Sequence, residues 1–519
     1  MSDFEKENNF NETKIDHTFK KEGRISSLRS ECSEDFILPD YMGDIKKVLS
    51  SSATVTPCNK YVSENEISLL NLVTFRVLYL DSEDVLTEAS FTKDFEINEK
   101  ISQGLLDFDA VSNVHNVTVR LGGPRKISAK ASIVSDISYV AEEEFPTENN
   151  FKNAECKYKK IKIHATDYKS SGEREYAEEI GVIDEVTSDE IEVVKYDAEA
   201  FIDSVYKTDS GFNVSGSLNA RCVLRVGDDI MRLEKSIPIE EGIEMDNSDI
   251  GVCYPRAYVS GAHININNST DDKNTGECYA SVVMNMTVEC AYVNHYNSEY
   301  TVVSDAFYEN SLNEHTYAGY GFNELIGGIF EKRKISFTYK RAENLMHDVV
   351  DKDFCVRNVK CSLAEDELTV SADLDFCIVS SDAKDTSCYS EKFTETINEK
   401  IKMNGVSESS IVRAHVTPCE FSPSFDNDKI YIEAYVSMFL VCESSKSETL
   451  LASLSSKESA EGGQRTVLVY YPEKNDTLWQ VAKKYSVPER KILRYNPTIS
   501  GIDGDEVNLS GVEKIIIVN

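Results

Sequence analysis

Apolar and polar positions alternate strictly in three separate stretches of the chain. The first covers residues 127–133, with the sequence ISAKASI, and the pattern returns at 278–288 and at 430–440. Successive side chains of a β-strand point to opposite faces of its sheet, so each stretch predicts a strand with one apolar and one polar face. Such strands are typical of antiparallel sheets that cover a core on one side.

Internal repeats place these strands in a larger pattern. The segment INEKI occurs at residues 97–101 and again at 397–401. Apolar stretches precede both copies, at 67–75 and 368–376, and residues 211–226 hold the same place in the middle of the chain. We therefore expect three successive units, each with an opening strand, a long central strand, a polar connection and a closing strand.

These patterns predict a mainly β protein built from three repeated antiparallel units, each of them a sandwich or an open barrel. The turn sequence LGGP at 121–124, just ahead of a closing strand, supports this assignment. Few helices are expected in the β units, and residues 41–49 and 323–330 are the best short candidates.

Composition divides the chain further. A stretch rich in Ser, with a Gly pair and little periodicity, follows the third closing strand and is typical of a flexible linker. The expected segments are a polar, flexible N-terminal segment at 1–34, β units at 35–145, 146–298 and 299–442, the Ser-rich linker at 443–464, and a small C-terminal domain at 465–519.

The C-terminal domain differs from the β units in its pattern of apolar and polar residues. A short strand at 466–470 is followed by Asp476, a good residue for a helix N-cap. One apolar helical face then follows, made of Leu478, Val481, Ala482 and Tyr485. A second helix starts near Pro488, and residues 514–518 form a closing strand. The predicted order is β-α-α-β.

The net charge of the chain limits the classes of molecule that it could bind. With 55 Lys and Arg against 90 Asp and Glu, the net charge of −35 argues against nucleic acids and anionic membrane surfaces. Residues 465–519 differ, because they hold eight basic and seven acidic side chains. Arg490, Lys491 and Arg494 form a basic run that could accept an acidic protein partner.

Cysteines and the N-terminus indicate the compartment. The 13 Cys are scattered, which indicates reduced thiols in a cytosol rather than a disulfide framework. The N-terminal sequence MSDFEKENNF does not resemble a secretory signal, and the sequence has no apolar run long enough for a transmembrane helix. We therefore expect a cytoplasmic protein without direct membrane insertion.

Enzyme motifs are missing from the sequence. Neither the phosphate-binding G-x-x-x-x-G-K-[ST], nor H-E-x-x-H, nor G-x-S-x-G occurs. His115 and His415 fall at matching repeat positions, but the middle unit has no His there, which favours a polar residue at a strand start. We expect a non-enzyme with no catalytic residues, no cofactor and no metal.

The C-terminal pattern resembles the LysM domain. The positions that agree are Asp476, Thr477, Leu478, Trp479, Ala482, Tyr485, Leu493, Asn496 and Pro497. The resemblance implies binding of N-acetylglucosamine polymers, such as peptidoglycan or chitin-like glycans, in a shallow groove. Its walls would be Asn475, Asp476, Thr477 and Leu478 on one side and Asn496, Pro497, Thr498 and Ile499 on the other. The alternative is that Asp476 only caps a helix and that Leu478 and Pro497 belong to the core.

The layout of the whole chain resembles clostridial spore-coat morphogenesis proteins, in which SPOCS-type repeats precede a LysM domain. The segment FILPD at 36–40 and the two INEKI segments carry this likeness. It implies a non-enzymatic scaffold in the mother-cell cytosol, at the forespore surface or retained in the spore coat. Its LysM domain would bind the coat basement-layer ATPase SpoIVA. A peptidoglycan or cortex-glycan binder is the alternative, and self-association through open sheet edges stays open.

Overall fold

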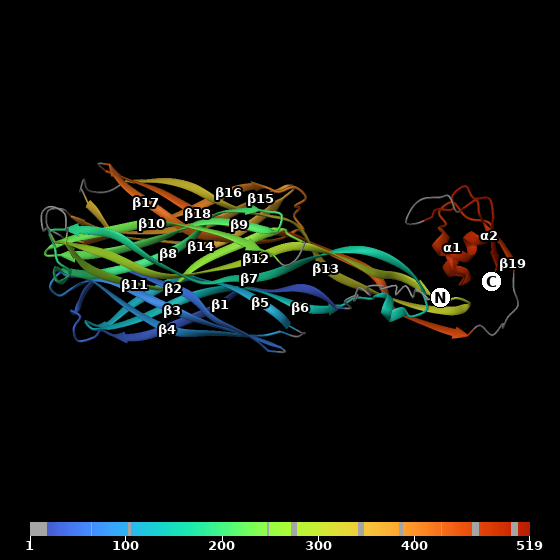
Figure 1. The fold of residues 1–519 in the computed structure, drawn as a ribbon, viewed down its shortest axis with the longest axis horizontal. Coiled ribbons are helices and arrows are strands. Elements are labelled where there is room, and N and C mark those ends of the chain that lie inside the picture. Colours follow the sequence, from blue (N-terminus) through green and yellow to red (C-terminus); the bar gives the residue numbers. More distant parts are fainter. Residues whose placement is uncertain are drawn as a thin grey trace, which may run out of the picture.

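The computed structural model describes most of the chain. The described residues are 18–63, 65–101, 105–245, 249–270, 278–340, 347–382, 388–426, 428–458, 467–499 and 507–518. Residues 1–17 of the expected N-terminal segment and 459–464 of the expected linker lie outside them. Strands dominate the described residues, and two short α-helices lie near the C-terminus (Figure 1).

Unit 1 is a sandwich of two antiparallel three-stranded sheets, with strand orders β1-β6-β5 and β2-β3-β4. Its strands are β1 (Thr18–Ile37), β2 (Ile45–Ser63), β3 (Glu66–Asp81), β4 (Leu86–Lys100), β5 (Leu105–Gly123) and β6 (Lys126–Glu144). The first and last strands pair, and the four strands between them supply the second sheet and one edge of the first. The expected antiparallel sandwich is thereby confirmed.

Units 2 and 3 repeat this topology, with sheet orders β11-β12-β7 and β10-β9-β8 in unit 2 and β13-β18-β17 and β14-β15-β16 in unit 3. Unit 2 contains β7 (Glu155–Asp184), β8 (Ile191–Lys207), β9 (Gly211–Val226), β10 (Asp229–Glu244), β11 (Val252–Thr270) and β12 (Cys278–Phe307), with 3-10 turns η1 (Glu148–Phe151) and η2 (Ser188–Glu190). Unit 3 contains β13 (Ser311–Lys340), β14 (His347–Ala364), β15 (Glu367–Asp382), β16 (Cys388–Lys402), β17 (Ile411–Asp426) and β18 (Lys429–Glu458).

The three alternating stretches, which the sequence predicts as closing strands, form β6, β12 and β18. Each of these is the central strand of a three-stranded sheet. Their apolar positions face the sandwich interior, as shown by Ile127, Val282 and Ile432, which are fully buried. The two INEKI segments lie in the equivalent strands β4 and β16. A central strand is flanked by neighbours on both sides, so the burial of its faces follows the pleat and shows clearly in the sequence.

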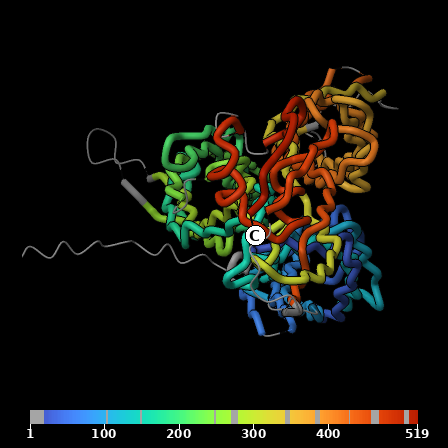
Figure 2. Tube along the Cα trace, turned by 90° about the vertical axis from the view of Figure 1, so that its right-hand side faces the viewer, coloured from blue at the N-terminus to red at the C-terminus, as the bar shows by residue number. Residues whose placement is uncertain are grey.

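The three units surround a common axis, and Figure 2 shows them as three lobes seen along the length of the molecule. Equivalent apolar residues meet between the units: Leu49 and Leu78 from unit 1, Val194 and Val223 from unit 2, and Val350 and Val379 from unit 3. At equivalent points early in β2, β8 and β14, the strand register shifts by one residue. Each of these shifts directs a buried apolar side chain toward the other two units.

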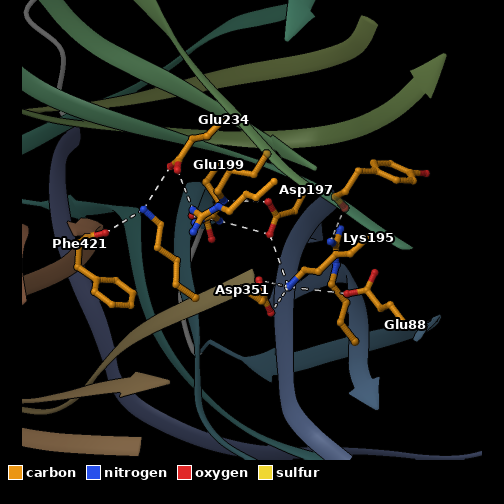
Figure 3. A network of polar contacts seen from close by, with 12 residues as sticks. Glu88, Lys195, Asp197, Glu199, Glu234, Asp351 and Phe421 are labelled. Atoms are coloured by element: carbon orange, nitrogen blue, oxygen red, sulfur yellow. Dashed lines mark hydrogen bonds and ion pairs between the residues drawn. The ribbon is translucent and has the colours of Figure 1, made fainter. Parts of the chain in front are cut away.

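The next residue after each shift is also buried, but its chemistry differs between units: Ser50, Lys195 and Asp351. Lys195 Nζ donates to Asp351 Oδ1 and Oδ2 at 3.0 and 2.8 Å and lies 3.8 Å from Glu88 Oε1 (Figure 3). Burial lowers the pKa of Lys195, but the surrounding carboxylates outweigh it and raise that pKa. Glu88 of unit 1, Lys195 of unit 2 and Asp351 of unit 3 therefore meet in a buried ionic junction.

Four strands are 30 residues long: β7, β12, β13 and β18. They continue beyond the sandwiches as an extension, which we call the stalk, toward the C-terminal domain (Figure 1). The turn between β12 and β13 lies in this stalk, at residues 308–310.

The stalk corrects several expectations. Residues 443–458 of the expected linker belong to β18, where they pair with β13, and residues 18–34 of the expected flexible segment belong to β1. The predicted helix at 323–330 is part of β13, and residues 45–49 of the other are strand β2. These segments form strands because their few apolar side chains are buried together: Phe19, Phe322 and Leu450 share one apolar cluster, and Leu451 is fully buried in another.

The C-terminal domain has the expected β-α-α-β order, with β19 (Val467–Tyr470), α1 (Leu478–Tyr485), α2 (Glu489–Tyr495) and β20 (Ile515–Val518). β19 and β20 pair antiparallel. Its core includes Val481, Ile492 and Ile517, all at most 2% exposed. Among the described residues, none of the helices has the length and apolar character that spanning a membrane requires.

Candidate functional site

The turn into α1 forms the first wall of the expected groove. Thr477 is the N-cap of α1: its side chain accepts a hydrogen bond from Gln480 N at 3.3 Å, and Gln480 Oε1 accepts one from Thr477 N at 3.0 Å. The expectation that Asp476 caps the helix is wrong. Asp476 Oδ2 instead accepts hydrogen bonds from Tyr470 OH and Glu473 N, at 2.6 and 2.8 Å, and so fixes the preceding turn.

The loop after α2 forms the second wall. Asn496 is buried and ties α2 to β20, because its Nδ2 donates to Ile492 O and Ile516 O while its Oδ1 accepts from Ile516 N. All three distances lie between 2.7 and 2.8 Å. Asn496 is thus a structural brace whose polar atoms are already used.

Burial sorts the eight predicted groove residues into two groups. Leu478, Asn496 and Ile499 are at most 6% exposed and belong to the domain's interior. The residues that remain at the surface are Asn475, Pro497 and Thr498, which are exposed, and Asp476 and Thr477, which are half-buried. A ligand could therefore contact the turn and the loop only through this second group.

A different face of the domain is docked on the stalk. Trp479 Nε1 donates to Asp305 Oδ2 at 2.9 Å, and Lys483 Nζ donates to Asp305 Oδ1 at 2.7 Å. Lys483 also donates to Tyr317 OH at 2.6 Å. Burial alone would raise the pKa of Asp305, but the hydrogen bonds from Lys483, Trp479 and Tyr317 lower it. A partly buried, charge-assisted cluster therefore joins α1 to β12 and β13.

Apolar and backbone contacts extend this docked face. Phe307 is fully buried in the core cluster of the C-terminal domain, with its ring centroid 5.3 Å from that of Trp479. Ser486, the C-cap of α1, donates through its hydroxyl to Ser311 O at 2.9 Å and accepts from Asn310 N through its carbonyl at 3.0 Å. The tip of the stalk thus supplies part of the domain's own core.

The basic run expected to meet an acidic partner faces the stalk in part. Lys491 forms an ion pair with Glu309 in the β12–β13 turn. Arg490 lies 3.2 Å from Glu155 at the start of β7, and its side chain stays 76% exposed. Arg494 is exposed. Two of the three basic residues therefore contact acidic side chains of the chain itself.

The acidic residues of the stalk tip were missed by the sequence analysis. Asp305, Glu309 and Glu155 carry no motif, and carboxylates are too abundant in this chain for any one of them to stand out. The only available signal was the contrast between an acidic chain and a basic run in its C-terminal domain.

The two His at matching repeat positions have unrelated surroundings. His115 lines an open polar hollow formed by unit 1 residues such as Arg120 and by Arg357 of β14 in unit 3. His415 instead stacks on Tyr254 at 5.0 Å between ring centroids, and burial lowers its pKa to about 4. Both residues lie within strands, His115 in β5 and His415 in β17, so the prediction of a polar residue at a strand start is wrong. Their surroundings show no shared chemistry.

Comparisons with known proteins identify the C-terminal domain. Residues 473–508 match the LysM domain family, over a segment that includes α1 and α2. Searches of curated proteins and of solved structures gave no match for the chain. The match, the β-α-α-β order and the capped first helix agree, so the protein carries a LysM domain at residues 473–508, C-terminal to its three β units.

Proposed function

We propose that this protein is a non-enzymatic spore-coat adaptor, similar to the morphogenesis protein SipL. In this proposal the LysM domain binds the coat basement-layer ATPase SpoIVA, and the β units hold that domain away from their own acidic surface. The adaptor acts in the mother-cell cytosol and helps to attach the coat around the forespore. The likeness of the three β units and the FILPD and INEKI segments to SPOCS-type repeats supports this assignment.

One structural observation carries the adaptor proposal. The contacts that dock the LysM domain use Trp479, Lys483 and Ser486, whereas Asn475 and Thr498 of the expected groove are exposed. Docking and partner binding can therefore use different faces at the same time. A domain held in this way presents its groove from a fixed point at the end of the stalk.

Glycan binding is the second candidate, and the LysM match itself favours it. LysM domains in general bind peptidoglycan and related N-acetylglucosamine polymers, and the same exposed residues would contact a sugar chain. Polar and apolar groups side by side, such as Thr498 and Pro497, suit a carbohydrate as well as a protein surface.

A single pair of assays separates the two candidates. Full-length protein is incubated either with purified SpoIVA, followed by co-purification, or with insoluble peptidoglycan, followed by pelleting. The groove variant is N475R/T498R, which adds bulk at two exposed positions. The matched control is K46R/D428N, which changes two exposed positions of the β units.

The adaptor proposal expects SpoIVA to co-purify with the parent and the control at micromolar concentration, and the groove variant to lose at least tenfold in yield. Pelleting with peptidoglycan and no co-purification with SpoIVA would replace it by the glycan proposal. Equal co-purification by the parent and the groove variant would show that the groove is not the contact surface.

A further inference from the structure

A second cluster of ionisable side chains is buried between the three units, apart from the Lys195 junction and from the LysM domain. Its members are Glu22 of β1, His164 of β7, His295 of β12, Arg413 of β17 and Glu443 of β18. The side chains of Glu22, His164 and Glu443 are 4%, 1% and 2% exposed. A cluster so deeply buried requires its charges to be balanced internally.

One guanidinium serves two carboxyl groups in this cluster. Arg413 forms ion pairs with Glu22 and with Glu443, and His164 lies against both of them. A cation bound beside His164 would be a further positive partner for these deeply buried side chains.

The geometry supplies donor atoms for that cation. Glu22, His164 and His295 each offer one ligand atom, and these atoms lie within 4.8 Å of one another. His164 Nδ1 is 3.2 Å from Glu22 Oε2 and 3.4 Å from Glu443 Oε1. Ligand atoms of tetrahedral zinc are about 3.3 Å apart, given metal–ligand distances near 2.0–2.2 Å. His295 Nδ1 lies 3.1 Å from His164 Nε2, whereas Glu22 faces His164 Nδ1, so His295 must leave this contact to bind the same ion as the other two.

Two of the donor atoms have no hydrogen bond within the described residues. They are Glu22 Oε2 and His164 Nδ1. The other oxygen of Glu22 is held by Arg413, which also contacts Glu443 Oε1 at 2.5 Å. Buried polar atoms normally have partners, so an open pair of this kind next to a second His indicates a binding position. Arg413 would orient the carboxylate, as the outer partners of metal ligands commonly do.

We propose that Glu22, His164 and His295 form a structural zinc site that fastens unit 1 to unit 2. Two imidazoles and a carboxylate are a donor set that suits zinc, whose ligands in proteins are His, Cys and carboxylate groups. The site ties β1 to β7 and β12, and β7 and β12 continue into the stalk. Metal binding would therefore stabilise the base on which the LysM domain is held.

The test uses the full-length protein. Because the donor side chains are so deeply buried, the protein is unfolded and refolded with either Zn²⁺ or a chelator, dialysed, and its zinc content measured by mass spectrometry. Refolding with Co²⁺ gives a second measurement, since tetrahedral Co²⁺ absorbs strongly in the visible range. The variants are Glu22→Gln and His295→Gln, and the control is His263→Gln at an exposed position of β11.

The proposal expects about one zinc per parent chain and per control chain, and at least a tenfold loss in both site variants. It also expects zinc to raise the melting temperature of the parent and of the control, but not that of the two site variants. A folded parent that retains less than a tenth of a zinc per chain and shows no Co²⁺ band would overturn it. If the variants do not fold, the Co²⁺ spectrum of the parent decides alone.

Discussion

The indole of Trp479, the single Trp of the chain, donates a hydrogen bond to the carboxylate of Asp305 at 2.9 Å, 174 positions earlier in the sequence. This contact joins the LysM domain to the stalk and places a fluorescent reporter in the docked interface. Since Trp479 is only 8% exposed, its emission reports on docking as well as on the folding of the domain.

Replacing Asp305 by Ala is expected to loosen the LysM domain. The change leaves Trp479 Nε1 without its acceptor and leaves Lys483 Nζ with Tyr317 OH alone, which costs about 2 kcal/mol for charge-assisted bonds in a half-buried setting. We expect a red shift of Trp emission at unchanged circular dichroism of the β units. Asp428→Ala, at an exposed turn, is the control and should leave the emission unchanged. A red shift of equal size in both variants would contradict the docked arrangement.

Replacing Lys195 by Met should destabilise the three units together. Asp351 would be left as a buried carboxylate without its main partner, and breaking one side of such a pair typically costs about 3–5 kcal/mol. Urea unfolding, followed by circular dichroism, measures the change. Lys46→Met is the control, because its pair with Asp84 is more than half exposed and should contribute about 1 kcal/mol or less.

Adding Asp351→Leu to Lys195→Met tests the same junction from the other side. Replacing both partners removes the unpaired charge, so we expect the double variant to regain a large part of the lost stability. A double variant as unstable as the sum of two single losses would show that the two side chains do not interact.

The change in stability between acidic and neutral pH should depend on Glu88. Burial raises the pKa of Glu88 from its ordinary value of 4.5 to about 7, against the opposing effect of Lys195. The stabilising contribution of protonated Glu88 is complete below about pH 4.5 and is lost as the pH rises through about 7. At about 1.4 kcal/mol per pKa unit, the loss is about 3 kcal/mol.

Glu88→Gln should remove this pH dependence. We expect the variant to lose less stability than the parent between pH 5 and pH 8, measured by urea unfolding at each pH. Glu66→Gln, at an exposed position of β3, should behave as the parent does. Identical pH profiles for Glu88→Gln and the parent would show that Glu88 ionises normally in the folded chain.

Asn496 and Thr498, two neighbours in the predicted groove, should respond in opposite ways. Asn496→Ala removes the side chain that pairs with backbone groups of Ile492 and Ile516 and should destabilise the LysM domain by about 2 kcal/mol. Thr498→Ala, at an exposed position, should change stability by less than about 0.5 kcal/mol. Trp emission during urea unfolding of the full chain measures both. Equal stability of the two variants would contradict the bracing role of Asn496.

The sequence predicted those elements whose own side chains carry the signal. The central strands β6, β12 and β18 alternate because the other sheet of each sandwich covers one of their faces, and α1 shows an apolar stripe against a small core. The stretch 443–458 was predicted as a linker because its buried apolar residues, Leu450 and Leu451, are adjacent and show no strand period, and their packing partners, such as Phe19 and Val303, lie far away in the sequence. The partners of Lys195 could not be predicted, since Glu88 and Asp351 come from other units and only the arrangement of the units brings them together.

The residues of the candidate site could likewise be predicted only in part. Its motif placed Asp476, Thr477 and Leu478 at the turn into α1, but the choice of Thr477 as the cap depends on backbone geometry that either residue could satisfy. The docked face depends on Asp305 and Glu309, which lie in another domain. No local pattern around Lys483 or Lys491 could have indicated them.

The account holds that the LysM domain sits at a fixed place on the stalk, and zero-length carbodiimide crosslinking of the full-length protein tests this most directly. Carbodiimide joins an amine and a carboxylate only when they touch. We predict crosslinked peptides that join Lys483 to Asp305 and Lys491 to Glu309, alongside the pair Lys46–Asp84 within unit 1 as an internal control. Recovery of the Lys46–Asp84 crosslink without any crosslink between the LysM domain and residues 305–309 would contradict the account.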